Sequence, residues 1–213
     1  MSLRLGYTGR CVMASVALWM QMSLDGFAEG AGREVHWPVV DEELCAPFLD
    51  EFRAADAFLY GRETFEIMAA LWPTADSDHA FSPFYADFAR VWKDKPKIVL
   101  SRTLRAPGWN TRVIGRRAVD EIAALRSGPG GTVILFGGVE TASTCIANDL
   151  IDEYRLFVHP ILLGRGIPLF PSSVDTSRLR LTDVTTFDSA VVMMRYRPER
   201  REACGFAEVF NDS

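Results

Sequence analysis

The chain has 213 residues, of which 48% are hydrophobic and 24% charged, as in a folded globular protein rather than a disordered or low-complexity one. Its 23 basic and 28 acidic residues give a net charge of −5, which argues against nucleic-acid binding through a basic face. The apolar run 11–22 is shorter than the roughly 20 residues that a membrane span needs. We therefore interpret it as a buried strand and expect no membrane partner.

Strand and helix patterns alternate along the chain without an internal repeat or a long linker. This pattern predicts a single domain over residues 12–197, between a leader at 1–11 and a tail at 198–213. Strands are predicted at 12–19, 57–60, 97–100, 112–114, 132–136, 153–159, 179–187 and 190–197. Helices are predicted at 41–54, 62–71, 83–92, 118–126 and 138–149, and loops at 27–38, 73–81 and 162–166.

Local signals set several of these boundaries. Asp41 can cap the first helix, and Pro73 is expected to end the second one. Asp25 and Gly26 form a turn after the first strand, and residues 188–189 join the last two strands as a hairpin. The alternation predicts an α/β fold with parallel strands, to which the hairpin adds an antiparallel edge.

Cysteines and histidines give no sign of a metal or disulfide framework. The four cysteines form no C-x-x-C pair, which indicates free thiols in a reducing cytoplasm. The three histidines show no ligand spacing, so no metal site is predicted, and the missing H-x-E…P-C-x-x-C pattern excludes a zinc deaminase.

Three predicted strands end in the same way, with a glycine or serine followed by a helix or a loop. The pairs that follow them are Gly61-Arg62, Ser101-Arg102 and Gly137-Gly138. Ligands of parallel sheets bind outside the carboxyl ends of the strands, where glycines and helix starts bring N–H groups to a phosphate. Each pair alone is weak evidence, but together they predict a pocket for a phosphate-containing ligand. No G-x-G-x-x-G, P-loop or G-x-S-x-G motif supports a Rossmann site, a P-loop or a hydrolase.

These motifs resemble those of dihydrofolate reductases. Residues 61–66 are similar to the adenosine-phosphate motif, residues 98–103 to the loop that holds the 2′-phosphate of NADPH, and residues 136–141 to the Gly-Gly diphosphate turn. A resemblance over more of the chain, 12–197, is to the reductase domain of the riboflavin-biosynthesis bifunctional deaminase-reductase and its stand-alone relatives. It adds the Ser-Leu-Asp-Gly turn at 23–26 and the stretches 150–156, 160–166 and 169–170.

The resemblance implies a dihydrofolate reductase-like three-layer α/β/α fold and an NADPH-dependent reductase. Its activity would be hydride transfer to a small heterocyclic substrate, of the 5-amino-6-(5-phosphoribosylamino)uracil reductase type. Ser23 and Asp25 would contact the substrate, with Asp25 the candidate catalytic residue. The implied cofactor-binding residues are Gly61, Arg62, Thr64, Ser101, Arg102, Gly137, Gly138, Val139, Glu140 and Thr141. Phe136 departs from the pattern, because an acid usually precedes the Gly-Gly pair, and the substrate stays open.

Other interpretations remain open at this point. The fold could hold NADPH or another ligand without turnover, or it could act as an accessory dihydrofolate reductase if Asp41 or Glu42 points into the pocket. Asp25 could be an ordinary turn residue, and Arg62 could pair with Glu66 on its own helix.

The sequence also predicts a homodimer. Residues 191–194 form a continuous apolar run, which would leave an edge strand that is hydrophobic on both faces. A second copy would cover that edge, and the resemblance points to the same assembly.

Overall fold

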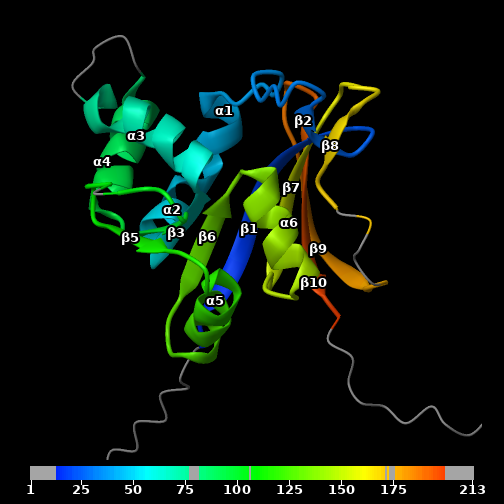
Figure 1. Cartoon of the computed structure of the whole chain (residues 1–213). Coiled ribbons are helices and arrows are strands. Elements are labelled where there is room, and N and C mark those ends of the chain that lie inside the picture. Colours follow the sequence, from blue (N-terminus) through cyan, green and yellow to red (C-terminus); the bar gives the residue numbers. More distant parts are fainter. Residues whose placement is uncertain (1–12, 77–81, 106, 171, 173–175, 200–213) are drawn as a thin grey trace, which may run out of the picture.

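The computed structural model describes residues 13–76, 82–105, 107–170, 172 and 176–199 (Figure 1). The predicted leader, most of the predicted tail, and Cys11, His79 and Cys204 lie outside these residues. Among the helices that are described, none is long and apolar enough to cross a membrane.

An eight-stranded sheet forms the middle layer, in the order β5-β4-β3-β6-β1-β7-β10-β9. Neighbouring strands from β5 to β7 run parallel, and β10 is antiparallel to both β7 and β9. The strands are β1 (Ser15–Ser23), β3 (Ala57–Gly61), β4 (Lys97–Leu100), β5 (Thr111–Ile114), β6 (Thr132–Phe136), β7 (Glu153–His159), β9 (Leu179–Thr186) and β10 (Val192–Pro198). The prediction of a mixed, mostly parallel sheet with a C-terminal antiparallel hairpin is confirmed.

Helices cover both faces of this sheet, which confirms the three-layer α/β/α arrangement. One face carries α1 (Glu42–Cys45), the 3-10 turn η1 (Ala46–Phe48), α2 (Leu49–Ala54), α3 (Arg62–Ala75) and α4 (Pro83–Asp94). The other face carries α5 (Ala118–Ser127) and α6 (Val139–Ala147). Because side chains alternate along a strand, Trp19 and Phe136 belong to the first core and Leu18 and Leu135 to the second.

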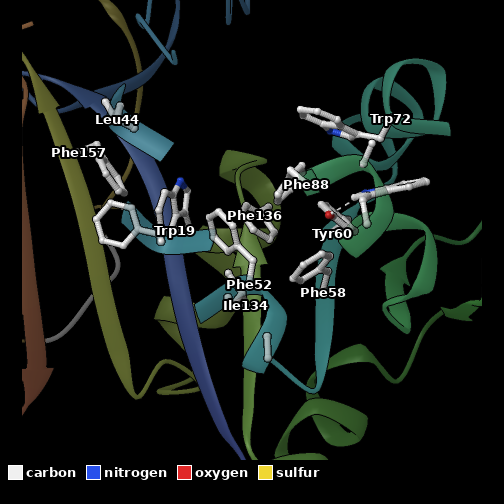
Figure 2. Close-up of a cluster of buried hydrophobic side chains, with 14 of the residues drawn as sticks. Trp19, Leu44, Phe52, Phe58, Tyr60, Trp72, Phe88, Ile134, Phe136 and Phe157 are labelled. Atoms are coloured by element: carbon white, nitrogen blue, oxygen red, sulfur yellow. Dashed lines mark hydrogen bonds between the residues drawn. The ribbon is translucent and has the colours of Figure 1, made fainter. Parts of the chain in front are cut away.

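The core under α1–α4 is largely aromatic, as Figure 2 shows. The ring centroid of Trp19 lies 4.9 Å from that of Phe52 and 4.4 Å from that of Phe157. The Trp92 indole N–H donates to the buried Tyr60 hydroxyl over 3.1 Å, so α4 is fixed to β3 (Figure 2). This packing holds the strands whose carboxyl ends carry the predicted motifs.

Two prolines behave differently from the sequence prediction. Pro47 divides the expected helix 41–54 into α1, η1 and α2, since a proline cannot donate the next helical hydrogen bond. Pro73 was expected to end the second helix, and this was wrong, because α3 continues through it to Ala75. Buried Trp72 and Ala75 hold this last turn against the core, and Trp72 contacts Phe88 with ring centroids 4.6 Å apart.

A segment of the predicted loop 27–38 and one that begins at the end of the predicted loop 162–166 form a small second sheet. Strands β2 (Phe27–Gly30) and β8 (Gly166–Pro168) pair antiparallel next to the end of β1. The first strand also extends to Ser23, beyond the predicted end at residue 19. Both differences lengthen the scaffold around the turn at residues 23–26.

The apolar run at 191–194 is not at an edge of the sheet. It enters β10, which lies between β7 and β9, and Val191 and Met193 are buried in the aromatic core. The edge strand next to β10 is β9, where Leu181 and Val184 are about half exposed. The edge-strand argument for a dimer was therefore wrong for β10, while the homodimer itself stays a prediction.

Candidate active site

The predicted motifs meet at one edge of the sheet. The chain runs from β1 to β3, β4 and β5 and then returns to β6, which lies between β3 and β1. Gly61 is in register with Leu100, and Leu59 with Leu135, so the ends of β3, β4 and β6 are level. Such a reversal of strand order creates the crevice in which open α/β sheets bind ligands.

The starts of α3 and α6 approach each other closely through two glycines. A Cβ on Gly61 would lie 2.6 Å from Thr141 Oγ1, and a Cβ on Gly138 would lie 3.0 Å from Thr64 Oγ1. Gly138 also has a φ of +73°, which favours glycine. Each glycine precedes its helix, and neither helix start has a side-chain cap. Two helix starts whose first backbone N–H groups have no side-chain cap therefore lie side by side, an arrangement that suits a phosphate-containing ligand.

The other α6 residues predicted to bind the cofactor divide into two kinds. Val139 and Thr141 are buried, so they fix the start of α6 against the sheet and α3. Glu140 is exposed, and its carboxylate accepts a hydrogen bond from the Arg33 guanidinium over 2.9 Å. The structure thus brings a negative charge and a paired arginine to this helix start.

A cationic cavity of about 410 Å³ opens beside the ends of β4 and β5. Ser101 and Arg102 line it, as do three residues that the sequence analysis missed, Arg105, Gly115 and Arg116. Among the ion pairs of the described residues, none joins Arg102, Arg105 or Arg116 to a carboxylate. Ser101 Oγ accepts the Leu104 N–H over 2.9 Å and so shapes the loop that carries Arg102 and Arg105. The cavity offers several positive groups to an anion.

Arg62 does not join that cavity. Its guanidinium lies 2.8 Å from Glu66 Oε2 and 3.1 Å from Glu63 Oε1, both on the same helix. This ion pair is the alternative that the sequence left open for Arg62. The arginines that point into the cavity come from the β4 and β5 ends instead.

Asp25 occupies the turn after β1 and ties two loops together. Oδ1 accepts the Ser23 hydroxyl over 2.6 Å, and Oδ2 accepts the Gly164 N–H over 2.7 Å. The hydroxyl of Ser23 and the N–H groups of Gly164 and Leu163 hold the pKa of Asp25 below its usual value. The carboxylate is thus engaged in holding the loop, and its substrate and catalytic roles stay predictions.

A second polar group at this edge was not singled out in the sequence. His159 pairs in register with Ser23, is buried, and has Nε2 2.7 Å from Gln21 Oε1. Burial lowers the pKa of His159, which favours the neutral ring. Trp37 packs edge-on against that ring with centroids 5.5 Å apart. In the sequence, His159 is marked only by its place at the end of a predicted strand. That signal is shared by many residues and does not single out His159 as a site residue.

Two of the three acids on the first helix have structural tasks. Asp41 caps α1 by accepting the Leu44 N–H over 3.0 Å, and Glu43 accepts the Asp188 N–H over 2.7 Å. The first contact stabilises the start of α1, and the second ties this helix to the turn between β9 and β10. The capping contact weakens the interpretation of Asp41 as a pterin-pairing acid.

The described residues contain no group of three potential ligands that could hold a metal ion. Two free thiols are described, partly buried Cys45 and buried Cys145. Burial raises the pKa of each to about 12, so neither is poised as a thiolate nucleophile.

Comparisons with known proteins agree with this architecture. The family model described as RibD C-terminal domain matches residues 14–193. YyaP of Bacillus subtilis (strain 168), described as uncharacterized, is 32% identical over 184 residues, which is 85% of this chain and 93% of YyaP.

Two solved structures share the fold at low sequence identity. One is a diaminohydroxyphosphoribosylaminopyrimidine deaminase/5-amino-6-(5-phosphoribosylamino)uracil reductase from Thermotoga maritima, with a TM-score of 0.59 and 18% identity over 87% of this chain and 57% of that one. The other is dihydrofolate reductase from Enterococcus faecalis complexed with NADP(H), with a TM-score of 0.55 and 19% identity over 88% of this chain and 96% of that one. The predicted dihydrofolate reductase-like fold is confirmed.

Proposed function

We propose that this chain, which belongs to the RibD C-terminal domain family, is an NADPH-dependent reductase of a small heterocyclic substrate. The observation that carries the proposal is the convergence of two uncapped helix starts and one arginine-lined cavity at level strand ends. The fold is shared with an NADP(H)-bound dihydrofolate reductase and a uracil reductase. When bound, the reduced nicotinamide supplies the hydride, and the protein supplies position and charge.

The residues present fit a dinucleotide. The glycines at 61 and 138 keep the two helix starts close together with their backbones bare, because a Cβ on Gly61 would collide with Thr141 and one on Gly138 would lie at the tight distance of 3.0 Å from Thr64. N–H groups of Val139 and Glu140 would hold the diphosphate at the α6 start. Arg102 and Arg116 would hold the 2′-phosphate, since a guanidinium binds a phosphate through two parallel hydrogen bonds.

Equilibrium titration with NADPH and NADH tests the cofactor assignment. A charge-assisted hydrogen bond contributes about 1.5–3 kcal/mol, so one contact to the 2′-phosphate gives NADPH roughly a tenfold to hundredfold preference. Arg102→Ala should reduce this preference and leave the affinity for NADH unchanged. Equal affinities in the wild type would refute the 2′-phosphate site, and an unchanged preference in the variant would remove Arg102 from it.

For the substrate, we propose hydride transfer to a C=N or C=O carbon of a small heterocycle, beside the turn at Ser23 and Asp25. Asp25 would act there by fixing this turn to the loop at Leu163 and Gly164. Positioning of the reactants can lower the reaction barrier by about 7–11 kcal/mol in total, and hydrogen bonds that hold a loop at the reaction site contribute to this positioning. Asp25→Asn is expected to raise KM for the heterocycle more than KM for NADPH.

One observation favours a second candidate, a protein that binds NADPH without turnover. Asp25, the candidate catalytic residue, has both carboxylate oxygens engaged, and its pKa is lowered. A single-turnover measurement with excess protein separates the two functions. Oxidation of bound NADPH by a pyrimidine or pterin supports the reductase, whereas stable NADPH in the presence of every heterocycle tested supports the binding protein.

A further inference from the structure

Arg33 connects three elements around the crevice at the starts of α3 and α6. Its Nη1 lies 2.9 Å from Glu140 Oε1, and its Nη2 lies 3.7 Å from Glu63 Oε2. Its Nε lies 3.3 Å from Glu29 Oε2, which comes from β2. One guanidinium therefore spans both helix starts while it is attached to the small sheet.

The three carboxylates are not equivalent. The Glu29 side chain is only 9% exposed, so its charge depends on the arginine. The Glu63 and Glu140 side chains are 64% and 76% exposed, so water can solvate them if the arginine leaves. Glu29 is thus a fixed anchor, and the other two glutamates are partners that can be exchanged.

The backbone at Arg33 also departs from the ordinary. Its φ of +65° is uncommon for a residue other than glycine. Hydrogen bonds on both sides keep this conformation, because Arg33 N–H donates to Gly30 O over 3.0 Å and Gly30 N–H donates to Glu34 O over 3.0 Å. The tight loop aims the side chain back at the crevice. Such strained positions are found where a side chain must be held for a function.

Charge explains why an arginine is needed here. Glu63 and Glu140 lie in the first turns of the two helices whose N–H groups face the crevice. Two carboxylates beside a diphosphate would repel it, and this repulsion opposes the attraction of the helix starts. A guanidinium placed between them cancels the repulsion, and its planar fork can bind phosphate oxygens directly.

We propose that Arg33 is a diphosphate clamp, which bridges Glu63 and Glu140 in the free protein and transfers Nη1 and Nη2 to the cofactor diphosphate on binding while Glu29 keeps its hold. This inference rests on the proposed function, because it assumes that a nicotinamide dinucleotide occupies the crevice. It adds a cofactor-positioning residue from a segment that carries no recognised motif. Binding would also draw β2 and the following loop toward the cofactor.

The test measures dissociation constants by tryptophan fluorescence, without turnover, for NADPH and for reduced nicotinamide riboside, which has no phosphate. Arg33→Met should weaken NADPH binding about tenfold to a hundredfold and leave the affinity for the riboside within twofold of wild type. Arg33→Lys keeps the positive charge and loses the planar guanidinium, so its affinity for NADPH should lie between those of wild type and Arg33→Met. If Arg33→Met does not fold, Arg33→Lys serves as the test variant. Arg53→Met is the matched control, since Arg53 is also 47% exposed and pairs with two carboxylates, and it should change neither constant.

Each outcome decides the matter. NADPH affinity within twofold of wild type in both Arg33 variants overturns the clamp and leaves the proposed function standing. Equal weakening of NADPH and riboside binding also overturns it, because Arg33 would then act only on the fold of the loop. Wild-type protein that binds no nicotinamide dinucleotide overturns the proposed function and the clamp together.

Discussion

Lys97 at the start of β4 gives a prediction about stability that follows from its surroundings. Its side chain is 1% exposed, and Nζ donates to Lys95 O over 2.8 Å and to Trp109 O over 3.0 Å. Nζ also lies 4.2 Å from the centre of the Trp92 ring. Burial lowers the pKa of Lys97 from 10.5 to about 8, and the charge of Asp94 opposes this shift only in part.

The sign of the effect follows from proton binding. Between pH 8 and 10.5 the lysine is neutral in the folded protein and still charged in the unfolded chain. The unfolded chain then binds more protons, so the free energy of unfolding rises with pH across this interval. The contribution is complete above the unfolded pKa and is lost as the pH falls through the folded pKa. Its size is about 3 kcal/mol, at 1.36 kcal/mol for each pH unit between the two values.

Urea unfolding of wild type and Lys97→Met, followed by tryptophan fluorescence from pH 7 to 10.5, checks this reasoning. The difference between the two curves isolates Lys97, since the other tyrosine, lysine and cysteine groups are common to both proteins. Wild type should gain up to about 3 kcal/mol relative to the variant as the pH rises. Two parallel curves would refute the idea that the buried ammonium is costly.

Three further results are expected at the site and at the sheet edge. Arg116→Ala should weaken the affinity for NADPH about tenfold and leave the affinity for NADH unchanged. The neighbouring Arg117 side chain is 79% exposed and pairs with Asp120, so Arg117→Ala should alter neither affinity in the same titration. Gly138→Ala should lower the urea-unfolding free energy by about 1–2 kcal/mol because of its positive φ, while Gly128→Ala, at a φ of −90°, should stay within about 0.5 kcal/mol of wild type. Sedimentation at micromolar concentration should show a dimer of the 23.8 kDa chain, and a single monomeric species would contradict the homodimer.

The sheet could be predicted well where local and global signals agree. Strands 97–100, 132–136 and 153–159 have the predicted bounds, because each contains an apolar run of at least three residues and is followed by a serine, glycine or proline. Strands β2 and β8 were missed, since Phe27–Gly30 and Gly166–Pro168 have little strand propensity and form through their pairing with each other. Pro73 was misjudged for a related reason, as burial of the neighbouring Trp72 outweighs the local preference.

The candidate site was predictable only where it follows a strand. Gly61, Ser101 and Gly137 mark strand ends, and parallel pairing brings such ends to one edge. Arg116 follows the short strand β5, which carries no motif. Arg33 lies in a segment with no periodic pattern, and its role depends on carboxylates that are 30 and 107 residues away along the chain. Contacts of this kind come from tertiary structure, which one sequence does not encode in its spacing.

The most direct test of the central claim follows a labelled hydride. The protein is incubated with NADPH that carries deuterium at the transferable position of the nicotinamide, together with a series of pyrimidine and pterin heterocycles, and the products are examined by mass spectrometry. A reductase predicts a heterocycle that is heavier by one deuterium and one proton, formed in equal amount with NADP⁺. NADPH that binds tightly yet keeps its deuterium with every heterocycle would contradict the assignment of a reductase.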